Sequence, residues 1–282
     1  MTDACCPSNS WGPLLTTAHD TKTPGKGELL TIGSDLEVYL TKPSTSECKK
    51  AIIVFTDVWG LQSRLFGICD QLSTDLNSVV IALDCFRGET KGSHSDPEDF
   101  KDWLRCYPFE EKAGESYSVK RDIECTLDYM TIEFKTETFS AIGFCWGVWA
   151  LTKACAEGID FKCGVGFHPS IKLEEVISGS ACSHVEMAAK ACTATPLLYL
   201  VAGNDMDNLK PPEGEVAKLI ESSYHKPRGK YDPRGKTIAP RCEVFPDMLH
   251  GWVSRGDTSQ EKVKEDAERA LKMGTDFISA WM

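Results

Sequence analysis

The chain of 282 residues has 31 basic and 42 acidic residues and a formal net charge of −11 at pH 7. A surplus of negative charge repels nucleic-acid phosphates, and no stretch approaches the roughly 18 consecutive apolar residues of a membrane span. We therefore expect neither a nucleic-acid nor a membrane partner. The first residues lack the basic start and the apolar stretch of a secretory signal, which predicts a cytoplasmic protein.

Thirteen cysteines are spread along the chain. Their odd number, the length of the chain and the lack of a secretory signal predict that most of them are reduced thiols. Their spacings include no pair of C-x-x-C motifs, so we expect no metal and no cofactor. Cys5 and Cys6 stand in a Pro- and Ser-rich segment and are expected in a solvent-exposed tail, with metal binding or redox chemistry as the alternative.

Residues 1–27 are polar and rich in Thr, Ser, Pro and Gly, which predicts an N-terminal arm ahead of a single domain over residues 28–282. Two β-like runs flank Gly33-Ser34-Asp35 and predict a hairpin. Unbroken apolar runs then predict strands buried on both faces, and apolar periodicity predicts helices. The strands are expected at 51–55 and 78–83 and the helices at 63–76 and 119–129, with an irregular stretch at 87–99.

The second half of the chain continues this alternation. Strands are expected at 139–142, 163–167, 196–201 and 241–245, with helices at 148–156, 214–222 and 261–281. The stretch 224–238 reads as a basic loop whose charges form a solvated face. The alternation predicts an α/β fold with a mostly parallel sheet covered by helices on both faces, and ligands meet such sheets at the carboxyl ends of the strands.

The strand expected at 139–142 runs into Gly143-Phe144-Cys145-Trp146-Gly147. A nucleophile between two glycines at a strand-to-helix turn is typical of a nucleophile elbow, whose strained turn holds the nucleophile out into a cleft. The helix N-terminus beneath it favours a thiolate and supplies N–H groups to a developing oxyanion. A buried structural cysteine beside two turn glycines is the alternative.

A cysteine nucleophile needs a base and an acid that orients the base. Asp205 lies in a turn after the strand expected at 196–201, with Asp207 as its rival, and His250 follows the last expected strand. The order Cys145, Asp205, His250 is the nucleophile, acid, histidine order of α/β-hydrolases. All three would lie at the same end of the sheet.

These residues resemble the dienelactone hydrolase family, and most of all its carboxymethylenebutenolidase-type eukaryotic cytosolic members, which carry a Gly-Phe-Cys-Trp-Gly elbow. The resemblance extends from about residue 28 to the C-terminus and implies an α/β-hydrolase fold. Three further segments contribute to it: Thr56-Asp57-Val58-Trp59-Gly60, Leu83-Asp84-Cys85-Phe86-Arg87-Gly88 and His250-Gly251-Trp252-Val253.

The resemblance implies roles for the residues that match the family's motifs. It makes Cys145 the nucleophile, His250 the base and Asp205 the orienting acid. The backbone N–H groups of Val58 and Trp146 match the two donors of an oxyanion hole.

Three charged residues match the family's pattern in other roles. Asp57 corresponds to a second carboxylate near the thiol, and such a charge would oppose thiolate formation until an anionic substrate enters. Arg87 and Arg255 correspond, each with an offset of one residue, to arginines that hold a substrate carboxylate. Pairing with surface acids is the alternative for both arginines.

The sequence therefore predicts a cysteine-dependent hydrolase of small carboxylic esters or lactones that forms an acyl thioester, as a monomer or weak dimer. The first alternative is a catalytically weak binding or interaction protein on the same fold. The second is a glutaminase-type amidotransferase, which needs a His-x-Glu pair that only His184-Val185-Glu186 offers. The natural substrate does not follow from these residues.

Overall fold

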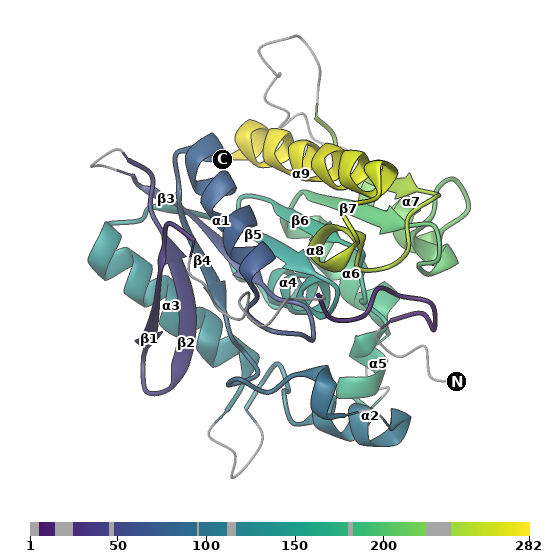
Figure 1. Ribbon diagram of the computed structural model, residues 1–282, viewed down its shortest axis with the longest axis horizontal. Helices are drawn as coiled ribbons and strands as arrows, with labels where there is room; N and C mark the ends of the chain where they lie inside the picture. The colour runs from purple at the N-terminus through teal and green to yellow at the C-terminus, as the bar shows by residue number, and fades with distance from the viewer. Residues whose placement is uncertain are drawn as a thin grey trace.

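The computed structural model describes residues 6–14, 25–44, 48–94, 96–111, 117–179, 183–223 and 238–282. Within these ranges eight strands form one sheet in the order β1-β2-β4-β3-β5-β6-β7-β8 (Figure 1). The pairs β1-β2 and β2-β4 are antiparallel, and the other neighbouring pairs are parallel. The predicted α/β class with a mostly parallel sheet is confirmed.

The central strands are apolar at nearly every position because helices cover both of their faces. In β3, Ile53 and Phe55 point into one hydrophobic cluster while Ile52 and Val54 point into the other, as the two-residue repeat of a strand requires. The strands are β1 (Glu28–Ile32), β2 (Leu36–Thr41), β3 (Lys50–Phe55), β4 (Val79–Leu83), β5 (Thr138–Phe144), β6 (Gly164–Phe167), β7 (Leu197–Ala202) and β8 (Arg241–Phe245).

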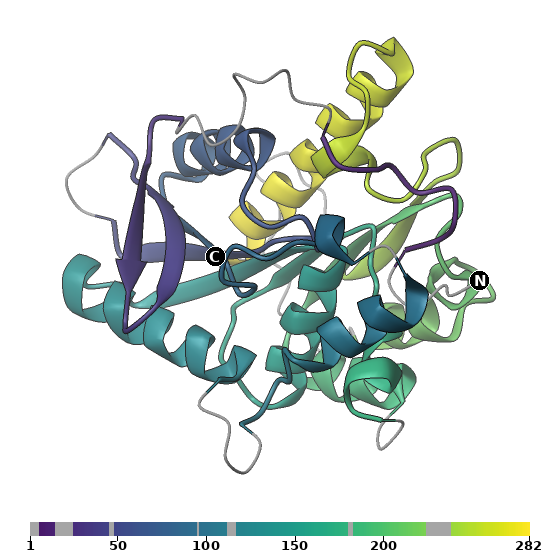
Figure 2. The same ribbon diagram turned by 60° about the horizontal axis from the view of Figure 1, so that its bottom comes forward.

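Two layers of helices enclose the sheet, which Figure 2 shows with α1 and α9 on one side and α3 on the other. The first layer is α1 (Ser63–Leu76), α8 (Trp252–Arg255) and α9 (Glu261–Trp281). The second is α2 (Pro97–Arg105), α3 (Val119–Phe134), α4 (Trp146–Ala156), α5 (Leu173–Ile177), α6 (His184–Ala194) and α7 (Glu215–Ser222). Two short 3₁₀ helices are η1 (Lys91–Ser93) and η2 (Asp207–Leu209). Among the helices of the described ranges, none combines the length and apolarity that crossing a bilayer requires.

The prediction of an irregular stretch at 87–99 is partly wrong, because η1 lies within it and α2 begins there at Pro97. The side chain of Asp96 accepts hydrogen bonds from the N–H groups of Glu98 and Asp99, and a proline at the first helical position is a favourable start. The helix predicted at 119–129 continues to Phe134. Residues 224–237 of the predicted basic loop lie outside the described ranges.

Candidate active site

Cys145 joins β5 to α4 at the carboxyl edge of the sheet. Its backbone has φ 53° and ψ −110°, a conformation that L-residues rarely adopt. The flanking glycines are required by close backbone contacts, since a Cβ atom at Gly143 would lie 2.4 Å from the carbonyl oxygen of Gly147, and one at Gly147 would lie 2.3 Å from that of Phe55. The strained elbow predicted from the sequence is therefore present, with a physical reason for both glycines.

His250 and Asp205 form a buried pair beside this elbow. The Nδ1 atom of His250 lies 2.6 Å from Oδ1 of Asp205, and both side chains are almost completely buried. The other carboxylate oxygen of Asp205 accepts a hydrogen bond from the N–H of Ala202, which fixes the acid against the end of β7. Asp207 has a fully solvated side chain that pairs with Lys210, so the structure brings Asp205 to the histidine and leaves its rival in solvent.

The thiol of Cys145 lies close to this imidazole. The Cys145 sulfur and a ring nitrogen of His250 lie within 4.8 Å of each other, and the buried Nε2 of His250 has no hydrogen-bond partner. Ser170 also contacts the thiol, with its Oγ 3.3 Å from the sulfur.

The charges of the site favour a protonated His250. Burial lowers the pKa of His250, but the Asp205 carboxylate and the neighbouring side chains of Cys145 and Cys6 raise it more, so this pKa lies well above its usual value. The second buried imidazole, His168, behaves in the opposite way, because burial lowers its pKa to about 3. The rings of His168 and His250 meet edge to face with centroids 4.9 Å apart, so the pKa values of two adjacent imidazoles are shifted in opposite directions.

Asp57 does not stand as an isolated charge near the thiol. Its Oδ2 accepts hydrogen bonds from Ser254 Oγ and Arg255 Nε, both at 2.8 Å, and its Oδ1 accepts one from the N–H of Trp59. Because the guanidinium neutralises the carboxylate, Asp57 opposes thiolate formation less strongly than an unpaired acid would. The predicted tuning of the thiol by Asp57 stays a prediction, with Arg255 now part of it.

The predicted oxyanion donors lie at the same edge of the sheet as the nucleophile. Val58 follows β3 and Trp146 follows β5, and these strands are parallel neighbours with Phe55 opposite Gly143. The amide of Trp146 is the first of α4, and such amides lack an acceptor inside their own helix. Both amides are therefore placed near the elbow, while their role in catalysis stays a prediction.

Arg87 forms ion pairs outside the Cys145 cluster. Its guanidinium donates to both carboxylate oxygens of Asp122 at 2.8 Å and pairs with Asp35, while Tyr117 stacks against it. These partners come from α3 and from the hairpin, so pairing with acids accounts for Arg87. For Arg255 the partner is the buried Asp57 rather than a surface acid, although its Nη2 atom has no partner.

The N-terminal segment 6–14 covers the mouth of the site. The sulfur of Cys6 lies 3.5 Å from that of Cys145, the N–H of Trp11 donates to the carbonyl of His250, and Arg255 donates to the carbonyls of Trp11 and Gly12. The expectation of a solvent-exposed tail is therefore wrong for Cys6, because the segment is tied to the strand-end loops. Cys5 lies outside the described ranges.

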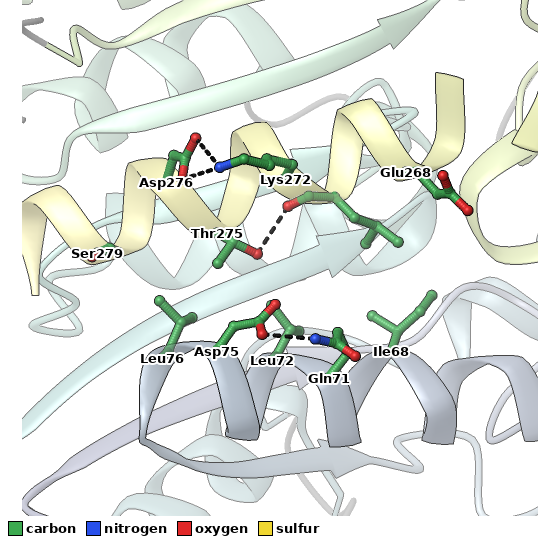
Figure 3. A pocket seen from close by; sticks show the side chains of 11 residues that line it. Ile68, Gln71, Leu72, Asp75, Leu76, Glu268, Lys272, Thr275, Asp276 and Ser279 are labelled. Carbon is green, nitrogen blue, oxygen red and sulfur yellow. Dashed lines mark hydrogen bonds and ion pairs between the residues drawn. The ribbon is translucent and has the colours of Figure 1, made fainter. Parts of the chain in front are cut away.

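Two hollows differ in their relation to this cluster. A cavity of about 440 Å³ opens beside His250 and is also lined by Ser170, Asn204, Pro7 and Ser8. A groove of about 620 Å³ runs between α1 and α9 (Figure 3) and is lined by none of the predicted site residues. Its polar side chains pair along their own helices, as Lys272 does with Asp276. Of these two hollows, the cavity is the one lined by predicted site residues, His250 and Asp205.

Sequence reasoning missed four residues around the thiol and the imidazole: Cys6, His168, Ser170 and Asn204. His168 and Ser170 follow β6, the neighbour of the elbow strand, so their position after a predicted strand could have indicated that they lie at the site. Asn204 accepts a hydrogen bond from the N–H of His250, and no local sequence pattern predicts that contact. The single His-x-Glu pair lies elsewhere, with His184 held by Glu175 and Asn208, which argues against the amidotransferase alternative.

The comparisons with known proteins agree with this arrangement. Residues 36–282 match the family model described as the dienelactone hydrolase family. The chain is 26% identical over 221 residues to a carboxymethylenebutenolidase homolog from Xenopus tropicalis, covering 78% of this chain and 76% of that protein. It is 25% identical over 222 residues to the carboxymethylenebutenolidase homolog from Homo sapiens, and the match covers 78% of this chain and 77% of that protein.

Solved structures share the fold at low sequence identity. An esterase from Pyrobaculum calidifontis superposes with a TM-score of 0.57 at 13% identity, covering 91% of this chain and 85% of that one. The TT1662 protein of Thermus thermophilus superposes with a TM-score of 0.58 at 15% identity, covering 90% of this chain and 98% of that one. The sheet and its helices are those of an α/β-hydrolase fold. With the family model matching from Leu36 to the last residue, the chain belongs to the dienelactone hydrolase family and is a hydrolase of small carboxylic esters or lactones.

Proposed function

We propose that the ester or lactone is cleaved through Cys145 as nucleophile, His250 as general base and acid, and Asp205 as the group that orients the imidazole. The observation that carries the proposal is the position of His250, which bonds Asp205 through Nδ1, keeps a buried and unpartnered Nε2, and has a ring nitrogen within 4.8 Å of the Cys145 sulfur. A histidine held in this way has one fixed tautomer, and its free nitrogen can exchange a proton with the nucleophile.

In the acylation step the thiolate of Cys145 attacks the carbonyl carbon. The N–H groups of Trp146 and Val58 stabilise the oxyanion of the tetrahedral intermediate. Its collapse breaks the bond to the leaving oxygen, which takes a proton from His250, and an acyl thioester remains. The raised pKa of His250 supports a thiolate and imidazolium pair as the resting state, which supplies both the nucleophile and the proton.

In the deacylation step His250, now neutral, removes a proton from water, and the hydroxide attacks the thioester carbonyl. The carbon–sulfur bond breaks and releases the thiolate and the carboxylic acid, which gives its own proton to solvent and leaves as the anion. The proton retained by His250 restores the ion pair with the thiolate. Ser170 contacts both the sulfur and the cavity beside His250, so its hydroxyl is placed to bind the entering water.

The mechanism is tested by replacing Cys145 with Ala. We expect turnover of an activated aryl ester by Cys145→Ala to fall to the level of buffer, because the imidazole alone cannot form the thioester. The matched control is Cys106→Ala, which removes an exposed thiol and should hydrolyse the ester at the wild-type rate. A stoichiometric burst of leaving group in the wild type, with an acyl adduct mapped to Cys145 by mass spectrometry, identifies the thioester.

Hydrolysis by Cys145→Ala at the wild-type rate would contradict the mechanism. The same variants can be compared on lactones and thioesters, since a nucleophile common to all substrates must show the same loss on each. A loss confined to one substrate class would assign Cys145 to substrate binding instead.

A further inference from the structure

Cys6 has no part in ester cleavage as written above, yet it lies in one side-chain cluster with the proposed nucleophile and base. The sulfurs of Cys6 and Cys145 lie 3.5 Å apart, and both lie within 4.8 Å of a ring nitrogen of His250. We propose that Cys6, Cys145 and His250 bind one thiophilic divalent ion of the zinc type and that this ion holds the enzyme inactive. The inhibition rests on the proposed role of Cys145, whereas the binding of the ion does not.

The spacing of the sulfurs matches the geometry that zinc requires. A tetrahedral zinc ion with bonds of about 2.3 Å to sulfur separates two thiolates by about 3.8 Å. The observed separation of 3.5 Å is within a few tenths of an ångström of this value. The imidazole of His250 completes a three-ligand set, since its ring nitrogen lies within 4.8 Å of both sulfurs, and Ser170 Oγ is 3.3 Å from the Cys145 sulfur.

The hydrogen bond to Asp205 orients the imidazole of His250 as a metal ligand. Histidines that bind metals donate their other ring N–H to a carboxylate or carbonyl, which fixes the tautomer and the ring plane. Asp205 provides this contact at 2.6 Å and leaves the fully buried Nε2 without any hydrogen-bond partner. An ion at this nitrogen displaces its proton to solvent and satisfies a buried polar atom that is otherwise unpaired.

The charges around the cluster also suit a dication. Two thiolates offset the charge of the ion, and sulfur and imidazole ligands select zinc over calcium or magnesium. The nearest guanidinium, that of Arg255, is already paired with Asp57 at 2.8 Å, so its positive charge is largely compensated. Once the ion is bound, the two thiolates balance its charge and the Asp205 carboxylate leaves the site negative, which favours retention of a cation.

The N-terminal segment holds Cys6 in place, which lowers the entropic cost of assembling the ligands. Trp11 donates its N–H to the carbonyl of His250 at 2.9 Å, and Asn9 accepts a hydrogen bond from Asn204 at 2.8 Å. These contacts tie the segment to the loop that carries the ligand His250. An ion bound there joins the segment to the nucleophile and blocks access of the ester carbonyl.

The experiment titrates the full-length protein with zinc in a phosphine reductant, which keeps all sulfurs as thiols. Competition with a chromophoric chelator measures the affinity of wild type, Cys6→Ser and the matched control Cys106→Ser. We expect one tightly bound zinc in the wild type and the control, and an affinity reduced by at least about 10-fold in Cys6→Ser, because loss of a ligand costs more than loss of a supporting contact. Cobalt in place of zinc reports the thiolates directly through its charge-transfer absorption.

Zinc inhibition of ester hydrolysis is measured on the same three proteins. The zinc concentration for half inhibition should rise by at least about 10-fold in Cys6→Ser and stay unchanged in Cys106→Ser. No tight zinc in the wild type, or equal affinities in wild type and Cys6→Ser, would overturn the proposal. If Cys145→Ala remained active, the mechanism would fail, yet the Cys6-dependent zinc and cobalt titrations would still report the metal site.

Discussion

Two aspartates that are neighbours in one turn have opposite environments in the folded chain. Asp205 is buried and accepts hydrogen bonds from His250 and from the N–H of Ala202, whereas Asp207 points into solvent toward Lys210. The difference arises because the turn follows β7 directly, so Asp205 faces the loop after β8 while Asp207 begins η2. Position along the sequence alone could not separate the two.

Asp205→Asn should reduce kcat for ester hydrolysis by up to about 10⁴-fold, because an amide at this position favours the wrong tautomer of His250. Asp207→Asn is the matched control, with the same chemical change two residues away, and should leave kcat within a factor of about two, because its side chain is exposed. Steady-state kinetics on one aryl ester measures both variants. Similar losses in the two variants would refute the assignment of Asp205.

Among the secondary-structure elements, β5 and α4 owe their tight junction to glycines that have no room for a side chain. Gly147 in the first turn of α4 packs against the carbonyl oxygens of Phe55 and Thr56, so the helix N-terminus sits directly on the end of β3. This contact sets the elbow close to the loop that carries Val58. Another helical glycine, Gly67 of α1, has open space where a Cβ atom would lie, with no neighbouring atom within 4 Å, so its role is not one of close packing.

These two glycines provide a matched pair for a stability measurement. Gly147→Ala should lower the free energy of unfolding by about 1–3 kcal/mol, because the added Cβ would lie 2.3 Å from a backbone oxygen. Gly67→Ala should raise it by about 0.5–1 kcal/mol, since alanine is the better helix former and the site is open. Urea denaturation followed by circular dichroism compares the two. An unchanged stability of Gly147→Ala would show that α4 can move away from β3.

Arg87 links two other elements. It bridges Asp35 in the hairpin of β1 and β2 to Asp122 in α3, and its guanidinium lies over the ring of Tyr117. Burial raises the pKa of Asp122, although Arg87 lowers it, so desolvation is the larger effect on this carboxyl group. The pairing occupies the guanidinium with two acids, and the binding of a substrate carboxylate by Arg87 stays a prediction.

Across the whole molecule, the first described residues and the last loops meet at the reactive centre. Cys145 is completely buried, and Cys6 contacts it from a segment 139 positions away in the chain. The nucleophile of the resting protein is therefore covered by its own N-terminal segment. An entering ester has to displace that segment or approach through the cavity beside His250.

Deletion of residues 1–14 should raise the rate at which iodoacetamide alkylates Cys145 by several-fold, because the contacts that bury its sulfur are lost. Cys106, which is exposed with or without the segment, serves as the internal reference in the same mass-spectrometric experiment. Equal rates for Cys145 in the full-length and shortened proteins would mean that the segment does not limit access to the thiol.

The sequence by itself determined the features that depend on local pattern. Apolar runs predicted the central strands, helical periodicity predicted α1 and α9 with their observed bounds, and glycine spacing predicted the elbow at Cys145. These predictions succeed because strand and helix repeats and tight turns impose residue types within a few positions. The order of strands then placed Asp205 and His250 at the same edge of the sheet.

The tertiary structure alone decided which distant side chains meet. In the fold, Asp57 pairs with Arg255, 198 positions away in the chain, and Arg87 pairs with Asp122. Cys6 contacts the proposed nucleophile Cys145. Such contacts depend on how loops from separate strands fold over one edge, and no spacing in the chain encodes the distance between them. A charge that looks available for substrate in the sequence can thus be neutralised by a partner that only the fold supplies.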